Sequence, residues 1–209
     1  MRIKLAPIFA VVGISFASFG VQAESLVDGD ADAGKAKAIT CTACHGAEGN
    51  SVNPVWPNLA GQNAPYLIAQ LKAFKNGARI DPLMTAQAMM LSEEDMIDLA
   101  VYFEGLPTAA QSVANVDLVD RGEALWRGGN NERGTAACIA CHGPSGDGNP
   151  AASYPALAGQ HATYTAKQLR DYAAGTRKSD GKTMQMREIA ATLEEKDIEA
   201  LAAYVQGLK

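Results

Sequence analysis

The pentapeptide Cys-x-x-Cys-His occurs twice in this chain, as CTACH at residues 41–45 and as CIACH at residues 138–142. The copies start 97 residues apart and contain all four cysteines of the 209-residue sequence. If the protein is exported, four cysteines would first suggest two disulfides. A disulfide does not explain the histidine that closes each pentapeptide, which we call a CxxCH box. The pattern therefore predicts a duplicated site, with one copy in each half of the chain.

The two halves match beyond these boxes, which indicates an internal repeat. WPNLAGQ at residues 56–62 aligns with YPALAGQ at residues 154–160, and the match continues at the same offset of 98 to Arg79 and Arg177. The C-terminal segments align at an offset of 102, which places a four-residue insertion after Arg177. A further nine residues are inserted before the second box, around Asn130. We expect this insertion to form a surface loop.

Two domains, residues 24–110 and 111–209, follow from the repeat, because Pro107 and a run of small and polar residues interrupt the helical pattern between them. Domains this small often depend on a covalent staple, a metal or a cofactor. Apolar spacing of helical period occurs in both copies, at residues 64–76, 93–104, 162–174 and 195–206. No sustained alternation of apolar and polar residues occurs, so the predicted fold class is all-α.

The N-terminus has the pattern of a secretory signal peptide, residues 1–23. Arg2 and Lys4 precede an apolar run to about residue 19, and Val21-Gln22-Ala23 supplies small residues at a cleavage site. The run is short for a membrane span, which needs about 20 residues. We therefore expect export to the periplasm. Cleavage would take the formal net charge from −5 to −7, and an acidic protein is a poor candidate for binding nucleic acid.

The Cys-x-x-Cys-His box places two thiols and an imidazole on one turn. This arrangement suits a porphyrin, because the thiols can add to two vinyl groups and the imidazole can bind the iron. Covalent attachment of two haem c groups is therefore predicted at Cys41, Cys44, Cys138 and Cys141, with His45 and His142 as iron ligands. A zinc site would need the two cysteine pairs to converge, and a thioredoxin-like site would need a preceding strand; the sequence favours neither.

The sixth iron ligand is predicted from the repeat. Met84 and Met186 are the methionines that superpose at the offset of 102. Histidine with methionine raises the reduction potential and suits transfer of single electrons. The other mature-chain methionines, Met89, Met90, Met96 and Met184, are predicted to pack in the core or at a haem edge. His161 has Asn63 at its repeat position and is expected to be a surface residue that starts a helix.

The doubled unit of CxxCH, a Pro-x-Leu-x-Gly segment and a closing amphipathic helix resembles the dihaem cytochrome c4 family, which has tandem class I cytochrome c domains. The likeness covers essentially the whole mature chain. It implies that Pro57 and Pro155 use their carbonyls to accept hydrogen bonds from the axial imidazoles. It also implies that Trp56 and Tyr154 pack on the haems. Arg79 and Arg177 are candidates for contact with haem propionates, with an exposed position at a helix end as the alternative.

The resemblance implies a periplasmic carrier of single electrons rather than an enzyme. A quinol-oxidising bc-type complex would be the donor and a terminal oxidase the acceptor, with peripheral association with the membrane as a further expectation and no nucleic acid as partner. One alternative is a haem subunit bound to a dehydrogenase, such as a sulfide-oxidising flavoprotein. A second is a dihaem peroxidase, which would need one iron able to lose its sixth ligand; equivalent methionines in both repeats argue against it.

Overall fold

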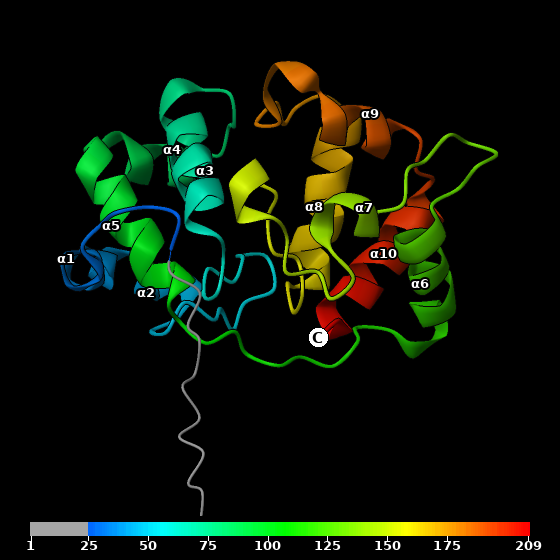
Figure 1. The fold of residues 1–209 in the computed structure, drawn as a ribbon, viewed down its shortest axis with the longest axis horizontal. Helices are drawn as coiled ribbons and strands as arrows, with labels where there is room; N and C mark the ends of the chain where they lie inside the picture. The colour runs from blue at the N-terminus through cyan, green and yellow to red at the C-terminus, as the bar shows by residue number, and fades with distance from the viewer. Residues whose placement is uncertain (1–24) are drawn as a thin grey trace, which may run out of the picture.

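The computed structural model describes residues 25–209, and the predicted signal peptide, residues 1–23, lies outside them. Helices form nearly all of the regular structure (Figure 1). The first half contains α1 (Ala31–Lys37), η1 (Ala38–Thr40), α2 (Thr42–His45), α3 (Ala64–Asn76), α4 (Pro82–Met89) and α5 (Glu93–Glu104). The second half contains η2 (Val116–Leu118), α6 (Val119–Gly128), α7 (Ile139–His142), η3 (Pro150–Ala152), α8 (Ala162–Ala173), η4 (Gly181–Thr183), α9 (Gln185–Ala191) and α10 (Glu195–Gly207). Within residues 25–209, β-type pairing is limited to two isolated bridges, so the all-α prediction is confirmed.

The four helices predicted from periodicity are present, and α3 and α5 have the predicted bounds. A capping box starts α5: the Ser92 hydroxyl accepts from the Asp95 amide at 3.0 Å, and the Asp95 carboxylate accepts from the Ser92 amide at 2.9 Å. Gly77, with φ of 80°, ends α3 in the left-handed conformation that glycine adopts without cost. Local chemistry thus sets these boundaries.

Each half is built on a crossing of its first and last α-helices, α1 with α5 and α6 with α10 (Figure 1). A glycine lies at each crossing. A Cβ on Gly34 would lie 2.1 Å from the carbonyl oxygen of Asp98, and a Cβ on Gly122 would lie 2.4 Å from that of Ala200. Only a residue without a side chain permits this approach, so the two glycines fix how closely the helices pack.

Each half of the described chain has its own apolar core, and the chain is a protein of two domains; in the second half a smaller cluster of Ala166, Ile198 and Ala202 lies beside the main one. The first core contains Ala38, Ala64, Leu67, Leu99, Ala100 and Phe103. The second contains Leu125, Trp126, Leu201, Tyr204 and Val205. The connection from α5 to η2 passes along one edge of the molecule (Figure 1). None of the helices in the described part of the chain is long and apolar enough to span a bilayer.

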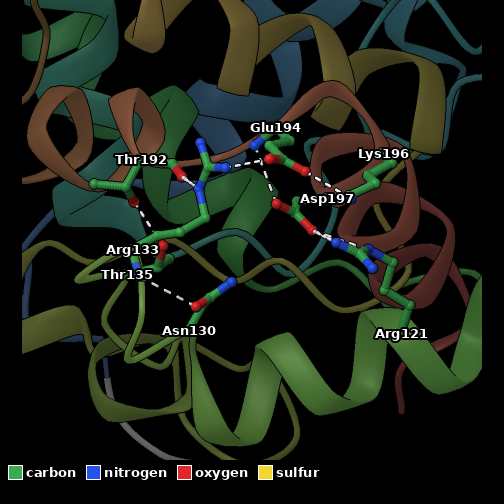
Figure 2. A network of polar contacts seen from close by, with 8 residues as sticks. All are labelled: Arg121, Asn130, Arg133, Thr135, Thr192, Glu194, Lys196 and Asp197. Atoms are coloured by element: carbon green, nitrogen blue, oxygen red, sulfur yellow. Dashed lines mark hydrogen bonds and ion pairs between the residues drawn. The ribbon is translucent and has the colours of Figure 1, made fainter.

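The nine-residue insertion of the second domain is held against the start of α10 (Figure 2). Arg133 donates to the carbonyl of Thr192 at 2.8 Å and pairs with Glu194, and the hydroxyls of Thr135 and Thr192 lie 2.7 Å apart. The side chain of Thr135 is buried. The insertion therefore forms a loop that is anchored on its own domain by polar contacts.

Candidate functional site

A single cavity of about 1470 Å³ extends through both domains. Ligand pockets usually measure roughly 300 to 1,000 Å³, so this cavity has room for two bound groups. Its lining includes every site residue that the sequence predicts, namely Cys41, Cys44, His45, Met84, Cys138, Cys141, His142 and Met186. The structure thus brings together, in each domain, one box and one methionine that are distant in sequence.

His45 and His142, the predicted axial ligands, end the one-turn helices α2 and α7, and both are buried. His45 Nδ1 lies 2.8 Å from the carbonyl oxygen of Pro57, and His142 Nδ1 lies 3.0 Å from that of Pro155. A carbonyl oxygen only accepts, so each Nδ1 carries the proton and donates it. This leaves Nε2 of each ring as the nitrogen that can bind a metal. The proline hydrogen bonds expected from the family resemblance are therefore present.

Burial sets the protonation of these groups. It lowers the pKa of His45 and of His142, although the bond to the proline carbonyl acts in the opposite direction. Burial likewise raises the pKa of the Cys41 thiol, and it raises that of Cys138 to about 11. The imidazoles are thus neutral, as a metal ligand must be, and these two thiols retain their protons at neutral pH.

Within residues 25–209, the two cysteine pairs do not converge on one metal site. All four are free, and all four line the cavity. No cluster of three or more His, Cys, Asp or Glu side chains in this part of the chain could hold a metal ion. A zinc site shared by the two pairs is therefore not formed, while two thiols and one imidazole facing a large cavity fit a covalently attached porphyrin.

The repeat separates Met84 and Met186 from the other methionines, as predicted, but the packing predicted for the others holds only for Met96, which is buried. Met89, Met90 and Met184 are exposed, so their predicted place in the core or at a haem edge is wrong. Met84 and Met186 line the cavity, and none of the other methionines in residues 25–209 does so. Met84 lies in the first turn of α4, where the Asp81 carboxylate caps the helix and accepts from the Met84 amide at 3.1 Å. Met186 lies in the first turn of α9. Each domain therefore offers one thioether to its cavity.

The two matched arginines form a cluster between the domains rather than exposed helix ends. Arg79 donates to the Tyr164 hydroxyl at 2.6 Å, and Arg177 donates to the Tyr66 hydroxyl at 2.8 Å. Both arginines are buried, and both share the amide oxygens of Gln70 and Gln168. We call these residues the arginine cluster: Tyr66, Gln70, Arg79, Tyr164, Gln168 and Arg177.

The charge of this cluster is not neutralised by a carboxylate. Neither Arg79 nor Arg177 forms an ion pair among the described residues, and both line the cavity. Burial opposes the charge of Arg177, but the neighbouring tyrosines raise its pKa above the ordinary value. Burial also acts to raise the pKa of Tyr164, and the two guanidinium charges outweigh it and lower that pKa. Buried charges require anionic partners, and the propionates of a haem would supply them.

A second set of interdomain contacts involves Gln62 and Gln160, which end the matched LAGQ segments. The Gln160 amide accepts from the Asn58 N–H at 2.9 Å and donates to the Asn58 carbonyl at 3.0 Å. The Gln62 amide makes the same two bonds to Ala156 of the other domain, both at 2.8 Å. All of these glutamine atoms are buried or nearly so. We call this reciprocal arrangement the glutamine clamp.

His161 starts α8, as predicted, but the expectation that it lies on the surface is wrong. It is buried, and its Nε2 lies 2.8 Å from the carbonyl oxygen of Ser51 in the first domain. Asn63, its repeat counterpart, donates to the Tyr154 carbonyl at 2.8 Å. Contact with the other domain removes both side chains from solvent, which the helical pattern of one domain does not reveal.

Trp126 is the cavity residue that sequence reasoning missed. Its side chain is 1% exposed and lines the cavity, and its ring centroid lies 6.3 Å from that of His142. Its indole N–H has no hydrogen-bond partner among the described residues. The first domain has Ala38 in the corresponding core, so comparison of the repeats gave no signal for it.

Comparison with known proteins agrees with this geometry. The sequence profile of the cytochrome c family matches residues 31–107 and 120–209. A cytochrome c4 from Pseudomonas aeruginosa is 50% identical over 180 residues, covering 86% of this chain and 89% of the relative. A thiosulfate dehydrogenase electron acceptor from Stutzerimonas stutzeri is 38% identical over 80% of this chain and 78% of the relative. The crystal structure of reduced recombinant cytochrome c4 from Pseudomonas stutzeri superposes with a TM-score of 0.84 at 46% identity, covering 87% of this chain and all of that chain.

Two helical domains, each with a CxxCH box facing the cavity, define a c-type cytochrome, and the chain belongs to the cytochrome c family. Within that family it is a member of the dihaem cytochrome c4 group. It carries two covalently bound haem c groups and is an electron carrier, not an enzyme.

Proposed function

We propose that this protein carries single electrons in the periplasm, from a quinol-oxidising bc-type complex to a terminal oxidase. The observation that supports this most is the pairing, in each domain, of one histidine with a free Nε2 and one methionine on the same cavity. Bound haem c supplies one-electron chemistry, because its iron alternates between the ferric and ferrous states. With one histidine and one methionine from the protein on each iron, no position would remain open for a substrate, as suits a carrier.

We assign the roles of the side chains within this proposal as follows. The thiols that hold the two haems are Cys41, Cys44, Cys138 and Cys141, and the axial ligands are His45, Met84, His142 and Met186. Residues 1–23 direct export, and the two domains comprise residues 24–110 and 111–209. The soft thioethers favour ferrous iron and raise both reduction potentials. The prolines orient the imidazoles through their Nδ1 protons.

The arginine cluster has a role in this proposal because its charges need partners. Arg79 and Arg177 meet between the two halves of the cavity, where propionates of both haems would pair with them. A guanidinium group binds a carboxylate through two parallel hydrogen bonds. The cluster would therefore neutralise the propionates and hold both haems against the domain boundary.

A second candidate function is delivery of electrons from a dehydrogenase of sulfur compounds, in place of a bc-type complex. The similarity to a thiosulfate dehydrogenase electron acceptor favours it. It uses the same haem ligands and differs in the donor alone. A sulfide-oxidising flavoprotein is one such donor, with this chain as its bound subunit.

The experiment that separates these functions uses the exported, haem-loaded protein. We expect two haems per chain, both low-spin, and inhibitor-sensitive reduction by quinol in membranes that contain a bc-type complex. Peripheral association is tested by whether the protein sediments with those membranes and is released by salt. Reduction by thiosulfate and a purified thiosulfate dehydrogenase, without reduction by quinol, would support the second candidate. A five-coordinate haem in the ferric spectrum would contradict both.

A further inference from the structure

In each domain, the glutamine clamp contacts the peptide group whose carbonyl oxygen accepts the hydrogen bond from the axial histidine. The carbonyl of Pro57 and the N–H of Asn58 belong to one peptide unit. The carbonyl end accepts from His45 Nδ1 at 2.8 Å, and the N–H end donates to Gln160 Oε1 at 2.9 Å. One peptide therefore lies between a histidine of the first domain and a glutamine of the second.

The other domain repeats this arrangement in the reverse direction. The Pro155 carbonyl accepts from His142 Nδ1 at 3.0 Å, and the N–H of Ala156 donates to Gln62 Oε1 at 2.8 Å. A glutamine that only stabilised the domain interface would not need to bond, in both domains, to the peptide that accepts from the axial histidine. Both hydrogen-bonded chains cross the domain boundary, and both end on an axial ligand.

The two glutamines are held firmly enough to act on the peptides that they contact. Gln160 is 7% exposed and Gln62 is 6% exposed. Each side-chain oxygen also accepts from the backbone N–H of the next residue in sequence, at 3.1 Å from His161 for Gln160 and at 3.0 Å from Asn63 for Gln62. Each side-chain nitrogen donates to a backbone carbonyl of the other domain, at 3.0 Å for Gln160 and 2.8 Å for Gln62. Water has little access to either chain of bonds.

Hydrogen bonds in such a chain polarise one another. A peptide whose N–H is bonded to an acceptor has a more negative carbonyl oxygen, and that oxygen accepts more strongly from the imidazole. A stronger bond at Nδ1 makes the imidazole a more basic iron ligand. A more basic ligand stabilises ferric iron relative to ferrous iron, which lowers the reduction potential.

We propose that Gln160 is a positioning residue for His45 and that Gln62 is one for His142, so that each domain tunes the reduction potential of the haem in the other. The inference rests on the proposed function, because it takes His45 and His142 as axial ligands. It deepens that function by making the two potentials depend on the contact between the domains.

The test compares Gln160→Met with Gln62→Met in the haem-loaded, full-length protein. Methionine is similar in size to glutamine and does not replace the bond to the peptide N–H. Spectroelectrochemical titration gives the two potentials, and each haem is identified by the methionine signal lost in Met84→Ala or Met186→Ala. Proton magnetic resonance of the histidine ring N–H gives an independent measure of the bond at Nδ1.

We expect Gln160→Met to shift the equilibrium of the first haem toward the ferrous form by roughly two- to fivefold. At 59 mV per factor of ten for one electron, this is about 20 to 40 mV upward. The second haem should shift by less than half as much, and the His45 ring proton should move upfield. Gln62→Met should give the mirror result, at the second haem and His142.

Three results would overturn the proposal. One is a shift confined to the haem of the substituted domain, and another is an equal shift of both haems, since either indicates a general structural effect. The third is unchanged potentials and ring-proton signals in folded, haem-loaded variants. Should Gln160→Met not accumulate, Gln160→Glu provides the test, because a carboxylate is a stronger acceptor and should lower the potential of the first haem. Failure of the proposed function is distinct, because membranes with a bc-type complex would then not reduce the wild-type protein, whatever the potentials of the variants.

Discussion

Replacement of Gly122 by alanine tests the helix crossing on which the second domain is built. Gly122 lies in α6 where this helix crosses α10. A Cβ at this position would lie 2.4 Å from the carbonyl oxygen of Ala200 and 2.5 Å from the Cβ of Tyr204. Both of these atoms are fixed to the α10 backbone, so neither can rotate away. The helices would have to separate.

The size of the effect follows from these distances. Optimal carbon contacts lie near 3.5 to 4 Å, so the crossing would have to open by roughly 1 Å. Overpacking of this kind costs about 1 to 3 kcal/mol, and occasionally more. The better helix propensity of alanine returns at most about 1 kcal/mol. We expect a net loss of about 1 to 2 kcal/mol in the free energy of unfolding, which lowers the melting temperature by about 2 to 8 °C.

The same helix offers a matched control. Gly128 ends α6, and a Cβ there would have no neighbouring atom within 4 Å. Gly128→Ala should therefore raise the melting temperature slightly, through helix propensity alone. Thermal unfolding of the haem-loaded proteins, followed by far-ultraviolet circular dichroism, gives both values.

Equal melting temperatures for Gly122→Ala and Gly128→Ala would refute the close approach of α6 and α10. The first domain supplies a second check. A Cβ on Gly34 would lie 2.1 Å from the carbonyl oxygen of Asp98, so Gly34→Ala should destabilise as Gly122→Ala does. A loss in one domain alone would mean that the two crossings are not equivalent.

Three further predictions concern the ligands, the domain boundary and pH. Met186→Ala should convert the second haem alone to a high-spin or water-bound form, and an unchanged ferric spectrum would contradict the ligand assignment. Arg177→Leu removes hydrogen bonds of 2.8 Å to both Tyr66 and Gln70. It should lower the free energy of unfolding by roughly 2 to 4 kcal/mol, as measured by denaturant titration. A change near zero would show that the arginine cluster does not stabilise the fold. The hydrogen bond from Lys37 lowers the pKa of Asp95 from 3.8 to about 2. The Asp95 carboxylate therefore stabilises the fold above pH 4, and this contribution is lost as the pH falls from about 4 to 2. The stability of Asp95→Asn should lack this loss between pH 4 and 2, and identical acid-unfolding curves for the two proteins would contradict the prediction.

The helices, and the placement of one CxxCH motif and one methionine on the cavity in each domain, could be predicted from the sequence because their signals are local or repeated. Periodicity and a capping box define α5 within one stretch of chain. The repeat compares two copies of one fold, so the shared offset selects Met84 and Met186 from the methionines of the chain. The cavity then contains these two and excludes the others that the structure describes.

The contacts between the domains could not be predicted in this way. The repeat marks Gln62 and Gln160 as equivalent, but equivalence does not say which residue each one contacts. A glutamine that bonded within its own domain would produce the same pattern. The burial of His161 and of the two arginines could not be predicted for the same reason, because each of these side chains is covered by the other half of the chain.

The glutamine clamp has the form of an isologous dimer contact within a single polypeptide. Gln62 contacts the residue after Pro155, and Gln160 contacts the residue after Pro57, so the two halves are related as the subunits of a twofold dimer are. The connection from α5 to η2 joins these halves. A short linker holds two partners at an effective concentration in the millimolar range. An interface of amide, tyrosine and guanidinium groups can therefore remain assembled in this chain at any dilution, whereas separate copies would have to find one another in solution.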